Sequence, residues 1–255
     1  MPGSVQSIER AAAILRLLAG GTGPLALGEV AGSLGLAKGT VHGILRTLQK
    51  VGFVEQDHDS GRYRPGADLL HLGNSYLDAN ELRSLAINWA DPLAARSHEA
   101  VRIGMLLDNS VLVVHHVFRP DDSVQAVDTG SRLPAHACAL GKVLLAFDVH
   151  AAACVMGRPL AAFTPLTLTM PVQLAAALTL IRARGWALEY AELRMGEAGL
   201  AAAVRDRGGL VVGAIGVSGP VDRLCGQSGA PRPALLTQVC DAADAIAREL
   251  AARRR

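Results

Sequence analysis

The sequence pattern that most constrains the fold lies between residues 36 and 52, in the stretch LAKGTVHGILRTLQKVG. Its apolar residues repeat at helical spacing and form one stripe at roughly 100° per residue; they are Val41, Ile44, Leu45, Leu48 and Val51. Gly39 and Gly43 interrupt the opposite face, although each glycine costs an exposed helix about 1 kcal/mol relative to alanine. The pattern predicts a helix that ends at Gly52 and whose outer face has little side-chain bulk.

Two helices and a hairpin flank this segment. Residues 7–18 repeat apolar side chains at helical spacing, and Ser7 is the expected cap of that helix. Residues 27–34 predict a short second helix, which Gly35 ends. The pattern of residues 53–65 predicts a strand, a glycine-containing turn and a second strand. Three helices followed by a β-hairpin indicate a winged helix-turn-helix domain.

The face of the third helix opposite its apolar stripe is basic. From Ala37 to Lys50 there are three basic residues and no acidic one. Arginine can bind guanine through two hydrogen bonds, and lysine and threonine can hold phosphates, so this face suits a DNA major groove. A merely solvated helix face, in a chain that contains 27 glycines, is the alternative. We predict DNA contacts from the following residues: Ser7, Lys38, Gly39, Thr40, His42, Gly43, Arg46, Lys50, Arg62 and Arg64.

Within the hairpin, the two arginines and the turn differ in what they offer to DNA. Arg62 and Arg64 can reach a neighbouring strip of phosphates. Asp57 and Asp59 lie at the tip, where phosphates would repel them. We therefore expect the arginines, rather than the tip, to contact DNA.

The remainder of the chain alternates between helical and strand patterns. Residues 67–77 predict a linker helix, and residues 81–97 predict a long helix that Pro92 should kink or break. Strand patterns cover residues 101–107, 110–117, 124–129, 187–192, 198–205 and 210–218, and further helical patterns cover 138–146, 172–184 and 233–254. Helices among mostly antiparallel strands indicate an α/β sensor-type domain. We therefore predict an α+β chain with a DNA-binding domain over residues 1–66, a linker over 67–80 and a second domain over 81–255.

The other chemistry-bearing residues favour neither a catalytic site nor a metal site. The four cysteines have no metal-ligand spacing and indicate reduced thiols in a cytoplasmic protein. His115 and His116 are neighbours in a predicted strand, so they point to opposite faces and do not suit a shared metal. His136 and Cys138 lack the third, orienting residue that an activated nucleophile needs. We expect no enzyme activity, no cofactor and no metal.

Charge and hydropathy indicate no membrane contact. The net charge of +2 by itself indicates no partner. The chain does not begin with a basic segment followed by an apolar run, which a signal peptide would need. Residues 159–181 are uncharged, but three prolines, a glutamine and four threonines interrupt them. We therefore expect a loop followed by a helix there, rather than a membrane span.

Ordered motifs run along the whole chain. In the first domain they are QSIERAAAILRLL, LALGEVAGSLGLAKGTVHGILRTLQKVGFVEQD and GRYRPG; in the second they are LPAHACALGKVLLAF, FTPLTLT, LIRARGWALEYAE and GLAAAVRDRGGLVVGAIGVSGPVDRL. This set resembles the IclR family of bacterial transcriptional regulators. The resemblance implies a dimer or dimer of dimers that binds palindromic operator DNA, with a GAF-like domain that binds a small metabolite. Within the family, VHHVFRPDDS and GLAKGTVHGILRTLQ look most like the regulators of actinobacterial glycerol operons.

A ligand site is expected at the start of the helix predicted over residues 138–146. Free backbone N–H groups of Ala139, Leu140 and Gly141 would form an anion site there, and a water-capped helix start is the alternative. The resemblance adds four ligand positions: Glu189, Gly199, Gly216 and Ser218. Family members that bind small acids usually have cysteine where Gly199 stands and serine where Gly216 stands. Two polar anchors are therefore absent, and space should be gained.

These features together predict a sequence-specific, DNA-binding transcriptional regulator, a repressor, of a metabolic operon under the control of a small effector. The altered pocket favours a polyol or a phosphorylated ligand, and glycerol or glycerol 3-phosphate is our hypothesis. The alternative is a regulator of the same family that responds to a small organic or aromatic acid and acts as an activator. An enzyme would need a positioned acid, base or nucleophile in a cleft. A protein-binding module would not need the acid-free basic helix face.

Overall fold

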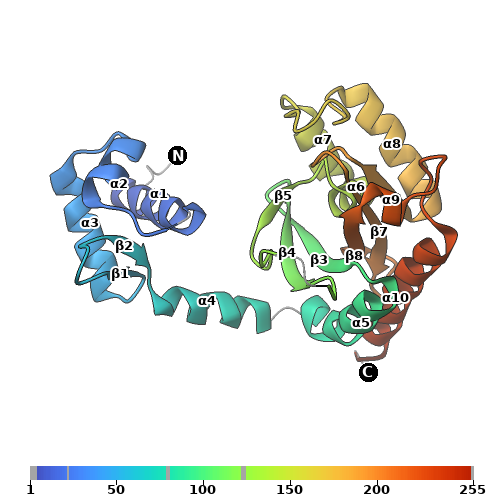
Figure 1. Ribbon diagram of the computed structural model, residues 1–255, viewed down its shortest axis with the longest axis horizontal. Helices are drawn as coiled ribbons and strands as arrows, with labels where there is room; N and C mark the ends of the chain where they lie inside the picture. Colours follow the sequence, from blue (N-terminus) through green and yellow to red (C-terminus); the bar gives the residue numbers. More distant parts are fainter. Residues whose placement is uncertain (1–4, 22, 79–80, 122–124, 254–255) are drawn as a thin grey trace. The chain divides into compact units, whose positions relative to one another are not determined.

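The computed structural model describes residues 5–21, 23–78, 81–121 and 125–253. Its internal contacts divide the chain into two compact units, residues 1–79 and residues 80–255 (Figure 1). The first unit contains helices and a small hairpin, and the second contains a larger sheet between helices.

The first unit is a winged helix-turn-helix. Its helices are α1 (Gln6–Gly20), α2 (Leu27–Leu34) and α3 (Lys38–Lys50), and its antiparallel hairpin consists of β1 (Val54–Gln56) and β2 (Tyr63–Pro65). Val41 and Leu45 of α3 are buried in one core with Ile14 of α1 and Val30 of α2. Gly35 adopts a left-handed conformation, with φ of 62°, and ends α2 as predicted. The periodicity of the sequence is therefore confirmed for all three helices.

Two boundaries in this unit correct the sequence prediction. Val5, not Ser7, is the N-cap residue of α1, no side chain caps that helix, and Ser7 lies inside its first turn. The predicted end of α3 at Gly52 is also wrong, because the helix ends at Lys50 and Gly52 turns the chain with φ of 73°. Val51 consequently falls outside the buried stripe and is 47 % exposed.

α4 (Ala67–Asp78) follows the hairpin and begins against it. The N–H of Ala67 donates to Glu55 of β1 over 3.3 Å. A Cβ placed on Gly52 would lie 2.1 Å from a carboxylate oxygen of Asp68, so the first turn of α4 packs closely on the end of α3. The helix predicted over residues 67–77 is thus present, and its start is held by the DNA-binding module.

A six-stranded sheet lies at the centre of the second unit. Its strands are β3 (Ala100–Leu107), β4 (Ser110–Val117), β5 (Arg132–Pro134), β6 (Trp186–Tyr190), β7 (Glu197–Arg205) and β8 (Val211–Pro220). They are ordered β5-β4-β3-β8-β7-β6. Each neighbouring pair is antiparallel. Asp108 and Asn109 join β3 to β4 with φ of 48° and 64°, values that suit the primed turns of tight hairpins.

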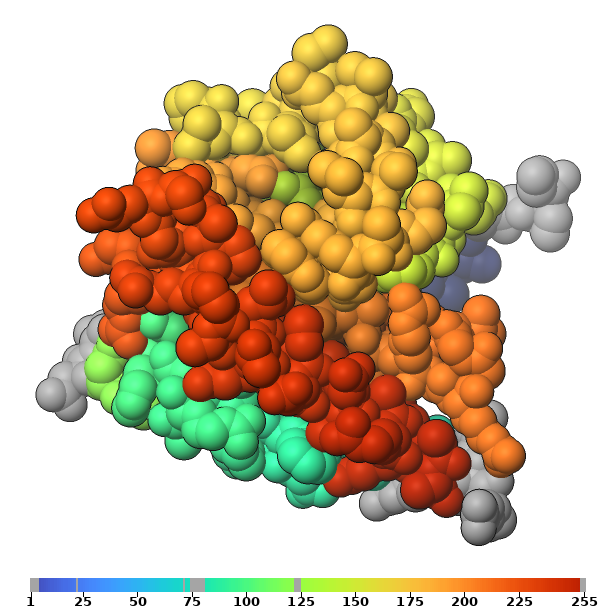
Figure 2. Space-filling view, turned by 90° about the vertical axis from the view of Figure 1, so that its right-hand side faces the viewer, coloured from blue at the N-terminus to red at the C-terminus, as the bar shows by residue number. Residues whose placement is uncertain are grey.

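Helices cover both faces of this sheet (Figure 1). α5 (Glu81–Ser97) and α10 (Pro233–Arg253) pack on one face, where Figure 2 shows them side by side. α6 (Ala139–Phe147) packs on the other face, and α8 (Pro171–Arg184) packs against α6. α6 is buried from Ala139 to Ala146, which explains why its sequence is apolar on all sides except at Lys142.

Several elements of the second unit differ from the prediction. The strand predicted over residues 124–129 is wrong: residue 124 lies outside the described residues, and residues 125–129 form no strand. Instead the side chain of Gln125 hydrogen-bonds both the N–H and the carbonyl of Arg119, at 2.7 and 2.9 Å, and β5 pairs with β4. Helices α7 (Val149–Met156) and α9 (Val221–Leu224) were not predicted. α5 continues through Pro92 without the expected break.

The described helices differ in length and composition from membrane-spanning segments. No single one of them is long and apolar enough to cross a membrane. α6 and α7 reach the required length and composition only as a pair, which is bent by 119°. Residues 159–170 form a loop and α8 follows it, as the prolines predict.

Candidate DNA interface and effector cavity

The outer face of α3 is exposed and basic. Lys38, His42, Arg46 and Lys50 are exposed, and Thr40 is half-buried. Among the described residues, no hydrogen bond or ion pair engages the side chains of Lys38, Arg46 or Lys50. These cations are therefore available to an anionic partner, and α3 carries no acidic residue in its first turn that would oppose one.

The two glycines of α3 lie between this basic face and α1. A Cβ placed on Gly39 or Gly43 would have no atom within 4 Å. Both glycines line a shallow groove, together with Ser7 and Ile8 of α1. Packing inside the unit therefore does not require either glycine, and both leave open a surface beside the basic residues.

The hairpin arginines are engaged within the unit. Arg62 contacts Glu29 at 3.0 Å and also donates to the carbonyl of Pro24. Arg64 contacts Glu55 at 2.9 Å. All four charged side chains are 42–58 % exposed, so these ion pairs are weak and solvent-screened. The two arginines remain predicted DNA contacts, whereas Asp57 is held by Ser60 in the turn at the tip.

A cavity lies in the second unit between the sheet and the start of α6. Ala139 and Leu140 of α6 line it together with Glu189, Gly199 and Ser218 from β6, β7 and β8. The strand register explains why the last three meet, since Glu189 pairs with Gly199 and Gly199 pairs with Ser218. Six of the seven predicted effector residues, all except Gly141, line this cavity.

Gly141 contributes to packing rather than to the cavity. A Cβ at this position would lie 2.3 Å from the Cα of Ala135, so only glycine allows α6 to approach that segment. Its N–H donates to Sγ of Cys138 over 3.4 Å. The predicted set of free N–H groups is therefore reduced to those of Ala139 and Leu140.

Glu189 places a buried carboxyl group at this end of the cavity. The side chain is 5 % exposed, and its Oε1 accepts from the N–H groups of Glu192 and Leu193 at 2.6 and 3.1 Å. A Cβ placed on Gly199 would lie 3.2 Å from Oε2 of Glu189 and 3.4 Å from the Cβ of Ala139. Oε2 thus faces the α6 start across the space that Gly199 leaves. Burial raises the pKa of Glu189 to about 7.

Gly199 and Gly216 both line the cavity, but for different structural reasons. Gly199 lines the cavity, but a Cβ there would meet Oε2 of Glu189 at 3.2 Å and the Cβ of Ala139 at 3.4 Å, so the space that this glycine leaves is narrow. The expectation that Gly216 also adds space is wrong, because a Cβ there would lie 2.6 Å from the carbonyl oxygen of Leu200 and 2.8 Å from the Cβ of Ala201. Gly216 is required by the close approach of β7 to β8.

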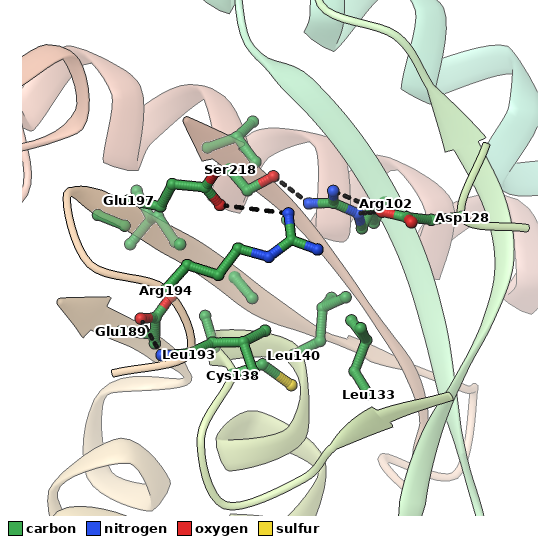
Figure 3. Close-up of a pocket in the computed structure, with 17 residues that line it drawn as sticks. Arg102, Asp128, Leu133, Cys138, Leu140, Glu189, Leu193, Arg194, Glu197 and Ser218 are labelled. Atoms are coloured by element: carbon green, nitrogen blue, oxygen red, sulfur yellow. Dashed lines mark hydrogen bonds and ion pairs between the residues drawn. The ribbon is translucent and has the colours of Figure 1, made fainter. Parts of the chain in front are cut away.

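Four charged residues of the cavity were not predicted. Arg102 of β3 and Arg194 of the β6–β7 loop reach the cavity near Ser218, and Asp128 and Glu197 lie beside them (Figure 3). A lone arginine among the apolar residues of β3 was the one available signal for Arg102. The other three lie in segments or at strand ends whose spatial position the local sequence pattern does not determine.

Family models match both units of the chain. The IclR helix-turn-helix domain matches residues 7–58, and the model "Bacterial transcriptional regulator IclR C-terminal" matches residues 74–248. The chain belongs to the IclR family. It is therefore a DNA-binding transcriptional regulator, and the prediction that it is not an enzyme agrees with the regulators named among its relatives.

Similar proteins cover the whole chain of this IclR-family member. It is 54 % identical over 254 residues to a glycerol operon regulatory protein of Streptomyces griseus, and 51 % identical over 254 residues to one of Streptomyces coelicolor, with 100 % of each chain covered. Among solved structures, an IclR transcriptional regulator from Alicyclobacillus acidocaldarius is 26 % identical. It aligns with a TM-score of 0.82 over 98 % of this chain and 99 % of that one.

The remaining candidate clusters of this regulator have structural explanations. Burial lowers the pKa of both His115 and His116. The charges that act on His115 are those of Arg83 and Asp91, whereas Arg102 and Asp128 act on His116, so the two histidines face different surroundings. The described residues contain no group of three potential metal ligands. Burial raises the pKa of Cys138 to about 12, so its thiol stays protonated and is a poor nucleophile.

A buried ion pair supports the cavity wall. Nζ of Lys142 in α6 contacts Oε1 of Glu192, and both side chains are at least nine-tenths buried. Thr164 and Thr167 donate to the carbonyl of Glu192 at 3.3 and 2.6 Å, which holds the loop before α8 against the same residue. These contacts fix the segment that carries Glu189 and Arg194.

Proposed function

We propose that this IclR-family regulator is a repressor of a glycerol-type metabolic operon, that it binds palindromic operator DNA as a dimer or dimer of dimers, and that a polyol effector controls it. The single observation that carries the DNA-binding part is the exposed, acid-free face of α3. The two Streptomyces relatives named as glycerol operon regulatory proteins support the operon class. We infer that the effector is glycerol or glycerol 3-phosphate.

The DNA contact follows from the chemistry of the α3 face. Arg46 lies in the middle of the helix, exposed and without an ion-pair partner among the described residues, so it can present its guanidinium to a guanine edge. Lys38 and Lys50 lie at the two ends of the helix, where they can reach phosphates. Arg62 and Arg64 of the hairpin would exchange their weak carboxylate partners for phosphates.

The effector preference follows from the inner end of the cavity. Oε2 of Glu189 accepts hydrogen bonds, whereas the N–H groups of Ala139 and Leu140 donate them. A hydroxyl group both donates and accepts, so it satisfies the two sides together. A carboxylate placed there would face the ionised form of Glu189, which disfavours the small-acid alternative at this end.

Regulation would proceed by a population shift. An effector changes operator affinity only if it binds the DNA-competent and DNA-incompetent states of the dimer unequally. We propose that effector binding favours a placement of the two DNA-binding units that no longer fits the operator half-sites. This accounts for induction by a metabolite in a repressor.

The DNA-binding part is tested by a gel shift on the chain's own upstream region with a salt series. Specific binding should weaken steeply with salt, because phosphate contacts release counterions. Arg46→Ala should lower affinity by about 1–3 kcal/mol and relax the sequence preference if Arg46 contacts a base. Arg16→Ala, which removes the same charge from an exposed position of α1, is the matched control. Absence of binding by the wild-type protein at low salt would overturn the proposal.

The effector part is tested by calorimetry on the full chain with glycerol and glycerol 3-phosphate. Binding of either, followed by release of operator DNA, supports the repressor proposal. Binding accompanied by tighter operator complexes would make the protein an activator. No binding of either polyol at millimolar concentration, while an organic or aromatic acid binds, would refute the polyol assignment.

A further inference from the structure

The effector cavity continues into a second, polar chamber. The two chambers share Arg102, Asp128, Arg194, Glu197 and Ser218, so their walls are continuous. The inner chamber, described above, contains the uncharged residues near α6, whereas the outer chamber is lined mainly by charged and polar side chains. A ligand that carries more than one polar group would therefore extend from Glu189 in the inner chamber to Arg102 and Arg194.

Arg102 is held rigidly at the junction of the two chambers. Its Nε donates to Oδ2 of Asp128 over 2.6 Å, and another guanidinium nitrogen donates to the hydroxyl of Ser218. In the sheet, Arg102 pairs with Gly216 of β8, which places no side chain beside it, and with His116 of β4 on its other side. The Arg102 side chain is 19 % exposed, which makes it a pre-oriented, largely desolvated cation.

Arg194 is held only loosely. It extends from the β6–β7 loop across the cavity, toward Ser218 and Arg102 (Figure 3). Its ion-pair partner is Glu197, at 3.8 Å, and the two side chains are 66 % and 50 % exposed. A long, exposed pair of this kind contributes little free energy, so a ligand can displace Glu197 at small cost.

We infer that the outer chamber is an oxyanion subsite, in which Arg194 and Arg102, with the hydroxyl of Ser218, bind the phosphate or carboxylate end of the effector. This inference rests on the proposed polyol effector, whose hydroxyls occupy the inner chamber near Glu189. Two guanidinium groups and a hydroxyl supply charge-assisted donors from different directions, which suits a tetrahedral phosphate. Arg194 is the specificity-determining residue, since it exchanges Glu197 for the ligand.

The subsite also relocates the anion that the sequence places at the start of α6. Oε2 of Glu189 faces that helix start, and the ionised form of this carboxyl group would repel a bound anion. Arg102 and Arg194 converge where the inner chamber opens into the outer one, which Arg119 also lines. A phosphorylated polyol bound in this orientation separates its charge from Glu189 by the length of its carbon chain.

The test is calorimetry on the full-length protein with four probes: glycerol, glycerol 3-phosphate, glycerate and inorganic phosphate. Arg194→Gln should weaken binding of glycerol 3-phosphate by about tenfold or more, because a charge-assisted contact is lost, and should leave glycerol unchanged. Arg132→Gln, which removes an ion-paired surface arginine outside the cavity, should affect neither ligand. Glu197→Gln should strengthen the binding of glycerol 3-phosphate a few-fold, because it removes the competing carboxylate.

The outcomes separate this inference from the proposed function. Equal weakening of glycerol and glycerol 3-phosphate by Arg194→Gln, or no effect on either, would overturn the oxyanion subsite. If the wild type binds glycerate or inorganic phosphate but neither polyol, and Arg194→Gln abolishes that binding, the subsite stands and the polyol proposal falls. A larger loss for glycerol 3-phosphate than for glycerate identifies a phosphate, and the reverse identifies a carboxylate, as the preferred anion.

Discussion

Replacing Gly43 of α3 by alanine and then by leucine should raise stability while lowering operator affinity. A Cβ at this position has no atom within 4 Å, so neither side chain meets steric conflict inside the unit. Alanine and leucine both favour the helix over glycine by about 1 kcal/mol. For a unit of roughly 60–100 residues this corresponds to a rise in Tm of about 4–8 °C.

Operator binding should change in the opposite direction, and by a graded amount. Gly43 lies beside the basic face, so a side chain there enters the space that DNA would occupy. Alanine adds one methyl group and should have a small effect. Leucine should hold the helix away from base edges, and a cost of about 1.4 kcal/mol for each of the two recognition helices of a dimer would weaken binding about a hundredfold.

Thermal unfolding of the full chain and a gel shift on the operator measure the two effects. Gly32→Ala in α2 is the matched control, because Gly32 is also an exposed helical glycine with no atom within 4 Å of its Cβ. It should give the same stabilisation and leave operator binding unchanged. Wild-type operator affinity in Gly43→Leu would refute the close approach of this face to DNA, and a lower Tm would refute the open surface.

Three further predictions concern the second unit. Lys142→Met should destabilise it by about 3–5 kcal/mol in urea denaturation, because Glu192 would stay buried and unpaired; adding Glu192→Leu should recover part of the loss. Folding raises the pKa of Glu189 from 4.5 to about 7. The free energy of unfolding should therefore fall as pH rises between those values, by roughly 3 kcal/mol at about 1.4 kcal/mol per pH unit. An unchanged pH dependence of stability in Glu189→Gln would contradict this. Gly216→Ala should cost about 1–3 kcal/mol of stability through overpacking, whereas Gly199→Ala should mainly lower effector affinity in calorimetry.

The local sequence pattern was sufficient to predict the helices and the hairpin of the first unit. The stripe of Val41, Leu45 and Leu48 predicts α3, and the structure buries all three. A helix of this length and a short hairpin are specified by residues close together in the chain, so periodicity and glycine positions locate them. Only the ends were misplaced, as at Ser7, because a helix boundary depends on which N–H groups find partners in the folded unit.

In the second unit, most of the predicted helices and strands are present, but their surroundings were not predicted. The strand over residues 110–117 was placed correctly, yet the neighbouring strand was assigned to 124–129 instead of to β5. β5 pairs with the start of β4, whereas the side chain of Gln125 hydrogen-bonds the backbone of Arg119. Gly216 was interpreted as lost side-chain bulk in a pocket, whereas the approach of β7 requires it.

The sequence by itself determined the winged helix-turn-helix, its basic and glycine-lined face, the antiparallel sheet of the second unit and, with the family resemblance, six residues that line the candidate effector cavity. Only the tertiary structure brought together the outer chamber. Arg102, Asp128, Arg194 and Ser218 come from a strand, two loops and another strand, and no local pattern links them. Their convergence depends on strand order and register, which are decided by long-range packing of the whole sheet rather than by neighbours in the chain.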